Sequence, residues 1–213
     1  MSTIFRLDTS IRMQGSVSRA IASTLESTLD ATRVIRRDVG MAPLPSTAWA
    51  TSSNAGWVPA DQRTPEQAAA VALAGELADE LIAADAFIFA TSLYNFGVSQ
   101  HAKTWIDLVI TDARFAPGGV RPIAGRPAYL VIARGGGYGA GTPREGWDHA
   151  TGWLKRIFVD VWGLDLEIID SELTLADVVP AMAELRELAA LNLKNAHVSA
   201  GEHGKRLVER LRG

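Results

Sequence analysis

Cysteine is absent from all 213 residues of the chain. This absence excludes disulfides, thiol redox chemistry, cysteine nucleophiles and cysteine-held iron or zinc, so any redox chemistry must come from a bound cofactor. The chain also lacks an apolar run of the roughly 18 residues that a membrane span needs, and its first residues lack the basic and then apolar stretch of a signal peptide. We therefore expect a cytoplasmic protein that has no membrane partner.

A strong excess of charge of either sign is lacking too, because 21 Lys and Arg residues stand against 24 Asp and Glu residues, for a formal net charge of -3. Charge so nearly balanced gives no reason to expect a nucleic-acid partner. The four histidines, His101, His149, His197 and His203, show no metal-ligand spacing, so no metal site is expected. With 47% hydrophobic residues and no polar linker, residues 1–213 are predicted to form a single domain.

Short apolar runs alternate with helical patterns along the whole chain. The runs predict five strands, at Ile4–Leu7, Val34–Arg36, Ala86–Ala90, Pro127–Ala133 and Leu166–Ile169. The patterns predict helices at Val17–Leu29, Thr64–Ala83, Ser99–Ile110, Trp147–Val161 and Ala176–His197, with a charged tail, Gly201–Gly213, that can form a short further helix. The alternation predicts an α/β fold, a doubly wound sandwich whose parallel sheet has helices on both faces.

The strand order of such a sheet decides where ligands bind. Two orders are common, and in the order 2-1-3-4-5 the crevice lies beyond the carboxyl ends of the first and third strands, bordered by the loop after the fourth. Each of these three strands is followed by a loop of unusual composition. We expect the three loops to form one ligand site.

The first of these loops offers the hydroxyls of Ser10, Ser16 and Ser18 ahead of the first predicted helix. Hydroxyls and a helix N-terminus favour an anion. Because no Lys stands in the frame that holds a nucleoside triphosphate, a single terminal phosphate, such as that of a flavin nucleotide, fits best. The alternative is that Ser16 or Ser18 only caps the helix.

The second loop places two aromatic residues and an amide, Tyr94-Asn95-Phe96-Gly97, at the end of a buried strand. The Asn95 amide needs partners there, and the edge of a flavin ring, with its alternating donors and acceptors, would supply them. Tyr94 and Phe96 are predicted to pack against such a ring. Taken alone, Phe96 fits a position in the core equally well.

The third loop, Arg134-Gly135-Gly136-Gly137-Tyr138-Gly139, is rich in glycine but does not match the dinucleotide-binding fingerprint. Its glycines would let the backbone approach a flat ring closely. Arg134 would bring a positive charge near the pyrimidine side of a flavin, where the reduced ring carries negative charge. The alternative is an ordinary exposed arginine in a glycine loop.

A stretch rich in Pro, Ser, Thr and Ala runs from Gly40 to Arg63 and is predicted to be irregular. Segments of that length without regular structure are usually lids or binding loops. Trp49 and Trp57 in this stretch, and Phe115 elsewhere, could stack on an aromatic substrate or anchor their loops. They also favour a dimer, because exposed aromatic residues are costly for a monomer.

Several of these motifs together resemble one family. Leu93-Tyr94-Asn95-Phe96-Gly97-Val98 with Lys103, Trp105, Ile106 and Asp107 is similar to the signature of the FMN-dependent NADH-azoreductases, a flavodoxin-like family of NAD(P)H:quinone oxidoreductases. Ala133-Arg134-Gly135-Gly136 and Ser10 with Ser16-Val17-Ser18 also resemble its segments. The resemblance implies the flavodoxin-like order 2-1-3-4-5. It also implies a homodimer with one FMN per subunit and ping-pong hydride transfer from NADH or NADPH through flavin to a quinone or azo compound.

The residues that match the family's motifs are the predicted FMN-binding residues: Ser10, Ser16, Val17, Ser18, Leu93, Tyr94, Asn95, Phe96, Ala133, Arg134, Gly135 and Gly136. Asn95, Arg134 and His101 are the candidate catalytic residues, with His101 as a possible proton donor to the reduced substrate. The chain departs from the family pattern at Ser99, Ala102 and Ala133, which leaves the natural acceptor and the choice between NADH and NADPH open.

Three functions fit these observations: a flavoenzyme reductase, a one-electron carrier of the flavodoxin kind, and a flavin-binding redox sensor without nicotinamide turnover. Carriers of this fold tend to be shorter and markedly acidic, so that they dock basic partners. This chain is nearly balanced in charge and has a long aromatic-bearing stretch suited to covering a substrate. The sequence therefore favours the reductase.

Overall fold

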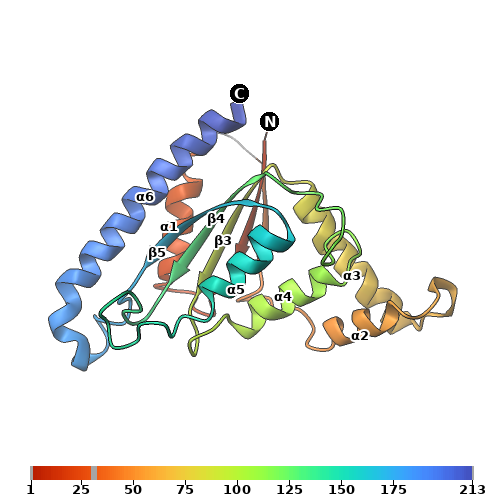
Figure 1. Cartoon of the computed structure of the whole chain (residues 1–213), viewed down its shortest axis with the longest axis horizontal. Coiled ribbons are helices and arrows are strands. Elements are labelled where there is room, and N and C mark those ends of the chain that lie inside the picture. Colours follow the sequence, from red (N-terminus) through yellow and green to blue (C-terminus); the bar gives the residue numbers. More distant parts are fainter. Residues whose placement is uncertain (1, 30–32, 213) are drawn as a thin grey trace.

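The computed structural model describes residues 2–29 and 33–212. In these residues, five parallel strands form one sheet in the order β2-β1-β3-β4-β5, as predicted (Figure 1). The strands are β1 Thr3–Asp8, β2 Arg33–Asp38, β3 Ala86–Ser92, β4 Pro127–Ala133 and β5 Asp165–Ser171. The carboxyl ends of β1, β3 and β4 therefore lie next to one another at one edge of the sheet.

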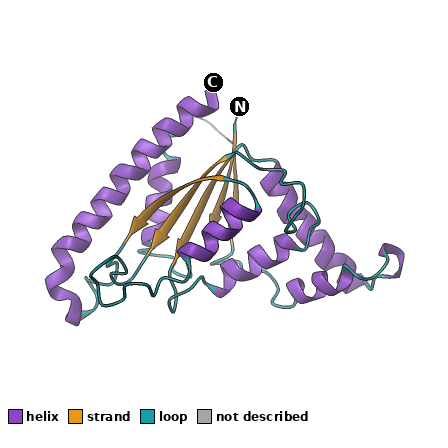
Figure 2. Cartoon of the chain, in the orientation of Figure 1, coloured by secondary structure: helices purple, strands orange, loops and turns teal. Residues whose placement is uncertain are grey.

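Helices cover both faces of the sheet (Figure 2). The α-helices are α1 Val17–Glu26, α2 Ala48–Ala55, α3 Pro65–Ile82, α4 Gln100–Ile110, α5 Thr151–Lys155 and α6 Arg186–Arg212. Successive side chains of a strand point to opposite faces, so Ile4 packs in the core beside α1 and α6, whereas Phe5 packs in the core beside α3, α4 and α5. The sheet is thus covered on both sides, as a parallel sheet requires.

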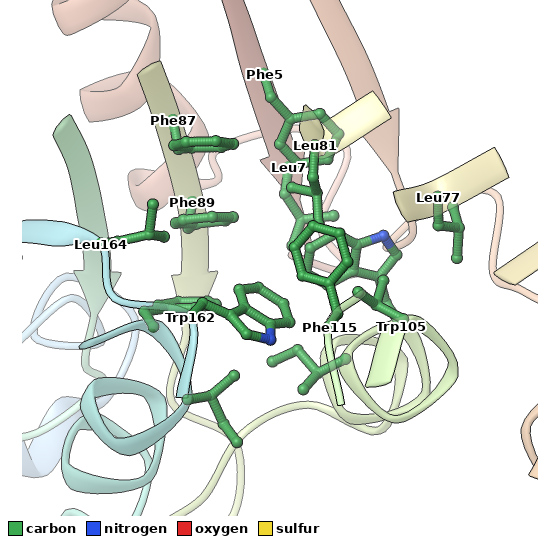
Figure 3. Packing of buried hydrophobic residues seen from close by; sticks show 14 of the residues in the cluster. Phe5, Leu7, Leu77, Leu81, Phe87, Phe89, Trp105, Phe115, Trp162 and Leu164 are labelled. Atoms are coloured by element: carbon green, nitrogen blue, oxygen red, sulfur yellow. The ribbon is translucent and has the colours of Figure 1, made fainter. Parts of the chain in front are cut away.

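The core beside α3, α4 and α5 is aromatic (Figure 3). The ring centroids of Phe89 and Phe158 are 4.2 Å apart, and those of Phe5 and Trp105 are 5.8 Å apart. Phe115 belongs to this core and is only 2% exposed, with its ring edge-on to Trp162 at 5.4 Å. The suggestion that Phe115 stacks on a substrate or favours a dimer is therefore wrong, because the ring is already used in packing.

Capping residues begin the helices near the sites that the sequence indicates. Thr64 and Gln67 form a capping box at the start of α3, with Pro65 at the first helical position. Ser16 and Ser99 accept hydrogen bonds from backbone N–H groups at the starts of α1 and α4. These caps satisfy N–H groups that would otherwise have no partner in the helix.

The stretch from Gly40 to Arg63 is not irregular throughout, which corrects the sequence prediction. It contains α2 and a short 3₁₀ helix, Ala60–Gln62. The sequence of α2 lacks an apolar stripe, and its N-cap residue Thr47 makes no side-chain hydrogen bond. Contacts with the rest of the fold hold the helix instead, among them the hydrogen bond of 2.7 Å between the hydroxyls of Ser52 and Thr111.

Three further helices differ from their predicted bounds, and the first of them, expected at Val17–Leu29, ends at Glu26. The helix expected at Trp147–Val161 begins only at Thr151, and its second part, Arg156–Val161, is a π-helix. Asp148 sets the start, because its carboxylate accepts hydrogen bonds from the backbone N–H groups of Ala150 and Thr151, both at 2.9 Å. At the end of the chain, a 3₁₀ helix, Pro180–Leu185, leads into α6, which continues through the supposed tail to Arg212. Within the described residues, no helix is long and apolar enough to cross a membrane.

Candidate functional site

A cavity of about 200 Å³ lies where the loops after β1, β3 and β4 meet. A fourth segment, which follows β5, completes its wall. The lining residues are Ser10, Arg12, Gly15, Ser16, Val17, Ser92, Leu93, Tyr94, Ala133, Gly135, Thr174 and Leu175. A cavity therefore lies at the carboxyl edge of the sheet, where the sequence predicts a ligand site.

Hydroxyl groups are concentrated at the end of the cavity formed by the first loop. The Oγ atoms of Ser16 and Ser18 are 3.4 Å apart, and those of Ser18 and Ser92 are 3.3 Å apart. Ser18 is fully buried and lies behind the cavity wall, whereas Ser16 lines the cavity. The two readings of these serines are compatible for Ser16, because its hydroxyl both caps α1 and faces the cavity.

Tyr94 ties the second loop to the first. Its phenol oxygen lies 3.5 Å from the Ser10 hydroxyl and accepts a hydrogen bond of 3.2 Å from the backbone N–H of Ile11. The phenol of Tyr94, expected against the ring, thus reaches the phosphate end of the cavity. No sequence pattern links residues that are 84 positions apart in this way.

A network of charged residues supports the first loop from behind. Arg19 donates a hydrogen bond of 2.7 Å to the carbonyl of Ser10 and two more, of 2.6 and 2.7 Å, to the carboxylate of Asp38. Burial raises the pKa of Asp38, but the hydrogen bonds from Arg19 and from the backbone of Met41 outweigh it and hold that pKa below its usual value. The charges of Arg19 and Asp38 therefore balance each other, and the loop position is fixed.

Gly40 allows the chain after β2 to approach the first loop. A Cβ atom at this position would lie 2.1 Å from the carbonyl oxygen of Ser10. Only glycine fits such a contact. The backbone of Gly40 thus packs directly against the carbonyl group to which Arg19 donates its hydrogen bond.

The second loop is a tight turn with two residues in the left-handed region. Tyr94 and Gly97 exchange backbone hydrogen bonds of 3.0 and 2.9 Å, and between them Asn95 has φ of 47° and Phe96 has φ of 67°. Asn tolerates this region, but for a bulky residue such as Phe it costs of order 1–2 kcal/mol. Strained backbone of this kind is concentrated at binding sites.

The third loop approaches the cavity through its backbone. Gly135 lines the cavity, and a Cβ atom on it would lie 2.7 Å from Leu175. The segment after β5 is held against this loop because Thr174 and Leu175 donate backbone hydrogen bonds to the carbonyls of Arg134 and Gly135, at 3.0 and 3.2 Å. Thr174 and Leu175 were absent from the predicted site, since nothing in their local sequence marks them.

The guanidinium of Arg134 is engaged with carboxylates and does not line the cavity. It lies 2.7 Å from both Asp148 and Asp170, and its side chain is 10% exposed. Burial raises the pKa of Asp148. Hydrogen bonds from Thr151 and the charge of Arg134 lower it by more, so that pKa is held below its usual value. These ion pairs fix the third loop to the start of α5, and the expectation that Arg134 brings positive charge near a flavin ring stays a prediction.

The structure brings together only part of the predicted site. Seven predicted residues line the cavity: Ser10, Ser16, Val17, Leu93, Tyr94, Ala133 and Gly135. Ser18 lies in the first turn of α1, and the other four predicted residues lie in the second and third loops but not in the lining: Asn95, Phe96, Arg134 and Gly136. His101, on the first turn of α4, is outside the lining as well, and its Nδ1 is buried without a hydrogen-bond partner among the described residues.

The donor set of the cavity suits a phosphorylated flavin. Hydroxyls and the N-terminus of α1 at one end favour a phosphate, as the sequence indicated. At the other end, the lining from Leu93, Ala133 and Gly135 presents apolar side chains and backbone, which suit a flat ring. The described lining contains no carboxylate that would repel an anion.

Comparisons with known proteins agree with this reading. A family described as having a flavodoxin-like fold matches residues 2–189. An FMN-dependent NADH:quinone oxidoreductase of Streptomyces avermitilis is 37% identical over 216 residues, which cover 99% of each chain. The chain belongs to this flavodoxin-like oxidoreductase family. A second member, the FMN-dependent NADH:quinone oxidoreductase of Frankia alni, is 36% identical over 197 residues, or 88% of this chain and 92% of its own.

Solved structures of the flavodoxin-like fold are similar as well. The azoreductase from Bacillus anthracis str. Sterne has a TM-score of 0.77 at 18% identity, with 97% of this chain and all of that chain covered. An FMN-dependent NADH-azoreductase from Bacillus anthracis str. Ames Ancestor, solved in complex with FMN, has a TM-score of 0.72 at 17% identity over 98% of this chain. At such identities the likeness shows a shared fold and no more.

Proposed function

We propose that the chain is an FMN-dependent oxidoreductase that uses NADH or NADPH to reduce a quinone or an azo compound. The observation that carries this proposal is the cavity, with hydroxyls at one end and apolar lining at the other, in a chain of this oxidoreductase family. When bound, FMN supplies the redox chemistry by accepting a hydride from the nicotinamide and passing it to the acceptor. The protein has to bind, orient and shield the cofactor.

The loops divide this work between them. Ser10, Ser16 and the backbone N–H groups that open α1 would hold the phosphate. Leu93 and Gly135 would contact the flavin ring, and the turn at Asn95 would place its amide at the polar edge of that ring. Arg134 contributes as a positioning residue, because its ion pairs with Asp148 and Asp170 fix the loop that contains Gly135.

Identification of the cofactor is the first test. The flavin is released from the purified protein by heat, and its mass is measured. We expect FMN, because the cavity has a phosphate end and the glycine loop does not match the dinucleotide-binding fingerprint. Recovery of FAD, or failure to bind FMN on reconstitution, would contradict the proposal.

Anaerobic reduction then separates an enzyme from a carrier or a sensor. We expect NADH or NADPH to bleach the flavin absorbance, and a benzoquinone to restore it. Double-reciprocal plots of the steady-state rate against nicotinamide concentration, at several fixed quinone concentrations, should give the parallel lines of a ping-pong mechanism. If neither nicotinamide reduces the FMN-loaded protein, the reductase is ruled out in favour of a carrier or redox sensor.

The role of Asn95 can be tested without disturbing its backbone. Asn95→Gly removes the amide, whereas glycine adopts the φ of 47° more easily than asparagine does. We expect this variant to lose flavin affinity and turnover while it stays folded. Wild-type affinity and turnover would show that the Asn95 amide does not contact the ring.

We also propose that the protein is a homodimer. Trp57 is 90% exposed and Trp49 is 47% exposed, and both lie on or just after α2. They line one surface groove together with residues of α4 such as Asp107 and Ile110. Exposed tryptophans beside a groove are typical of surfaces that pack against a partner.

A further inference from the structure

The charge of the cavity lining comes from one residue. Of the twelve described residues that line the cavity, Arg12 alone carries a charge. It stands at the same end of the cavity as Ser10 and Ser16, and its backbone N–H donates a hydrogen bond of 3.3 Å to the Ser10 hydroxyl. The cation is therefore anchored through its backbone beside the group that would meet the phosphate.

The neighbouring arginines behind the first loop are already paired. Arg19 is bound to Asp38 at 2.6 Å, and Arg6 is bound to Asp8 at 2.9 Å and to Glu26 at 2.9 Å. These guanidinium groups lie in a network whose carboxylates compensate their charge. They support the loop but leave little net positive charge for a ligand.

The side chain of Arg12 differs from them in having no such partner. It is exposed, and within residues 2–29 and 33–212 its guanidinium makes no hydrogen bond and no ion pair. A phosphate monoester carries close to two negative charges at neutral pH, and hydroxyls alone cannot neutralise it. A guanidinium binds phosphate through two parallel hydrogen bonds, which are among the strong ones in proteins.

We propose that Arg12 binds the phosphate of FMN and makes the protein select the phosphorylated flavin over riboflavin. This inference rests on the proposed function, because it assigns a residue to the cofactor named there. Ser10 and Ser16 supply neutral donors, the N-terminus of α1 supplies a partial positive charge, and Arg12 supplies the full charge that the rest of the lining lacks. Removing the charge should affect FMN and spare riboflavin.

The test compares the dissociation constants of FMN and riboflavin, measured from the quenching of flavin fluorescence as apoprotein is added. For Arg12→Ala we expect the value for FMN to rise by about ten- to a hundredfold, the range of a hydrogen bond to a charged group, while the value for riboflavin changes less than about twofold. Arg12→Lys should lie between wild type and Arg12→Ala, because Lys keeps the charge but not the paired hydrogen bonds. Added salt should weaken FMN binding more in wild type than in Arg12→Ala.

Arg144 provides the matched control. It is another exposed arginine, but its guanidinium lies at the third loop, where a Cβ atom on Gly136 would be 2.2 Å from Nη1 of Arg144. Arg144→Ala removes the same charge from the ring end, so the ratio of the FMN and riboflavin constants should stay at its wild-type value.

Three outcomes would overturn the assignment of Arg12. An unchanged FMN constant in Arg12→Ala would mean that the guanidinium does not reach the phosphate. Equal losses for FMN and riboflavin would mean that Arg12 only shapes the loop. The same change of ratio in Arg144→Ala would mean that the effect is one of overall charge. Failure of wild type to bind either flavin would instead refute the proposed function and this inference with it.

Discussion

Single residues with unusual backbone conformations shape the candidate site. Phe96 has φ of 67° and is 39% exposed, and its ring meets Trp147 edge-on at 5.3 Å. A phenylalanine with this φ would be avoided in an ordinary turn, where Gly or Asn is preferred. This conformation costs backbone energy, and because Phe96 lies outside the cavity lining, its packing against a flavin ring stays a prediction.

The strain at Phe96 can be measured by comparing two variants that both lack the ring. We expect Phe96→Gly to be more stable than Phe96→Ala by about 1 kcal/mol, because the left-handed backbone conformation strains alanine but not glycine. Urea unfolding of the two apoproteins gives the difference. If alanine is as stable as glycine, the turn is not strained in solution.

His101 was predicted as a proton donor, but the structure places it on α4 outside the cavity lining. We expect His101→Ala to keep the wild-type dependence of turnover on pH, since a proton donor must reach the substrate within hydrogen-bonding distance. The measurement is the rate of quinone reduction across the neutral range. A loss of turnover that grows as the pH rises would restore His101 as the donor.

At the scale of elements, a partly buried cluster of charges joins α1 to β1 and β2. Glu26 at the end of α1 accepts hydrogen bonds from Arg6 of β1 at 2.9 Å and from Arg36 of β2 at 2.8 Å, and its side chain is 17% exposed. Burial raises the pKa of Glu26, but the hydrogen bonds from Arg36 and Arg6 outweigh this effect and hold that pKa below its usual value.

A carboxyl group whose pKa is lowered in the folded state stabilises the protein above its unfolded pKa, and that contribution is lost as the pH falls. We therefore expect Glu26→Gln to lower the free energy of unfolding by about 1–3 kcal/mol at neutral pH, with the difference shrinking below about pH 4. Denaturant unfolding at several pH values tests this. Glu184→Gln is the control, because Glu184 is exposed and makes no hydrogen bond with described residues.

The packing of α6 on α1 depends on one of its two glycines. A Cβ atom on Gly204 would lie 1.8 Å from the Thr28 hydroxyl oxygen and 2.8 Å from the Leu25 carbonyl oxygen, whereas one on Gly201 would meet nothing within 4 Å. Gly204→Ala should therefore destabilise the protein by about 1–3 kcal/mol through overpacking. Gly201→Ala should stabilise it by up to about 1 kcal/mol through helix propensity. Thermal unfolding of the two variants measures these changes in stability. Similar changes in both variants would contradict the close approach of α6 to α1 at Gly204.

Elements were predictable where local chemistry alone determines them. The capping box at Thr64 and the continuous apolar run at Ala86–Ala90 are local signals, and the structure confirms α3 and β3. The helix α2 could not be predicted, because it lacks an apolar stripe and is held by contacts such as that of Ser52 with Thr111. For the same reason Leu175 was missed at the cavity, since only the pairing of its segment with the third loop brings it there.

At the scale of the whole molecule, the arrangement of the sheet was predicted because alternating strands and helices permit few topologies. The surface was harder to predict, because burial depends on contacts distant in sequence. Phe115 and Trp57 illustrate this, as both are large aromatic residues in loops, yet one is 2% and the other 90% exposed.

The proposed homodimer gives a prediction at this scale. We expect sedimentation at micromolar concentration to yield the mass of two chains, and Trp57→Ser to shift the equilibrium toward monomer, because the exposed indole would lose its contact across the interface. The far-ultraviolet circular dichroism of the variant should match that of wild type. A monomeric wild type would contradict the dimer, and a dimeric Trp57→Ser would place the interface elsewhere.

The helices α1 and α6, which pack against each other, lie far apart in the sequence. Ile21 and Leu25 of α1 share one core cluster with Ala200 and Leu207 of α6, and Thr24 is hydrogen-bonded to His197 at 2.7 Å. Thr24 and His197 are 173 residues apart, and a ribosome makes the chain from its N-terminus, so this apolar side of α1 stays uncovered while the residues between them are made. A chain that stopped before α6 would therefore expose the apolar side of α1 to chaperones and proteases.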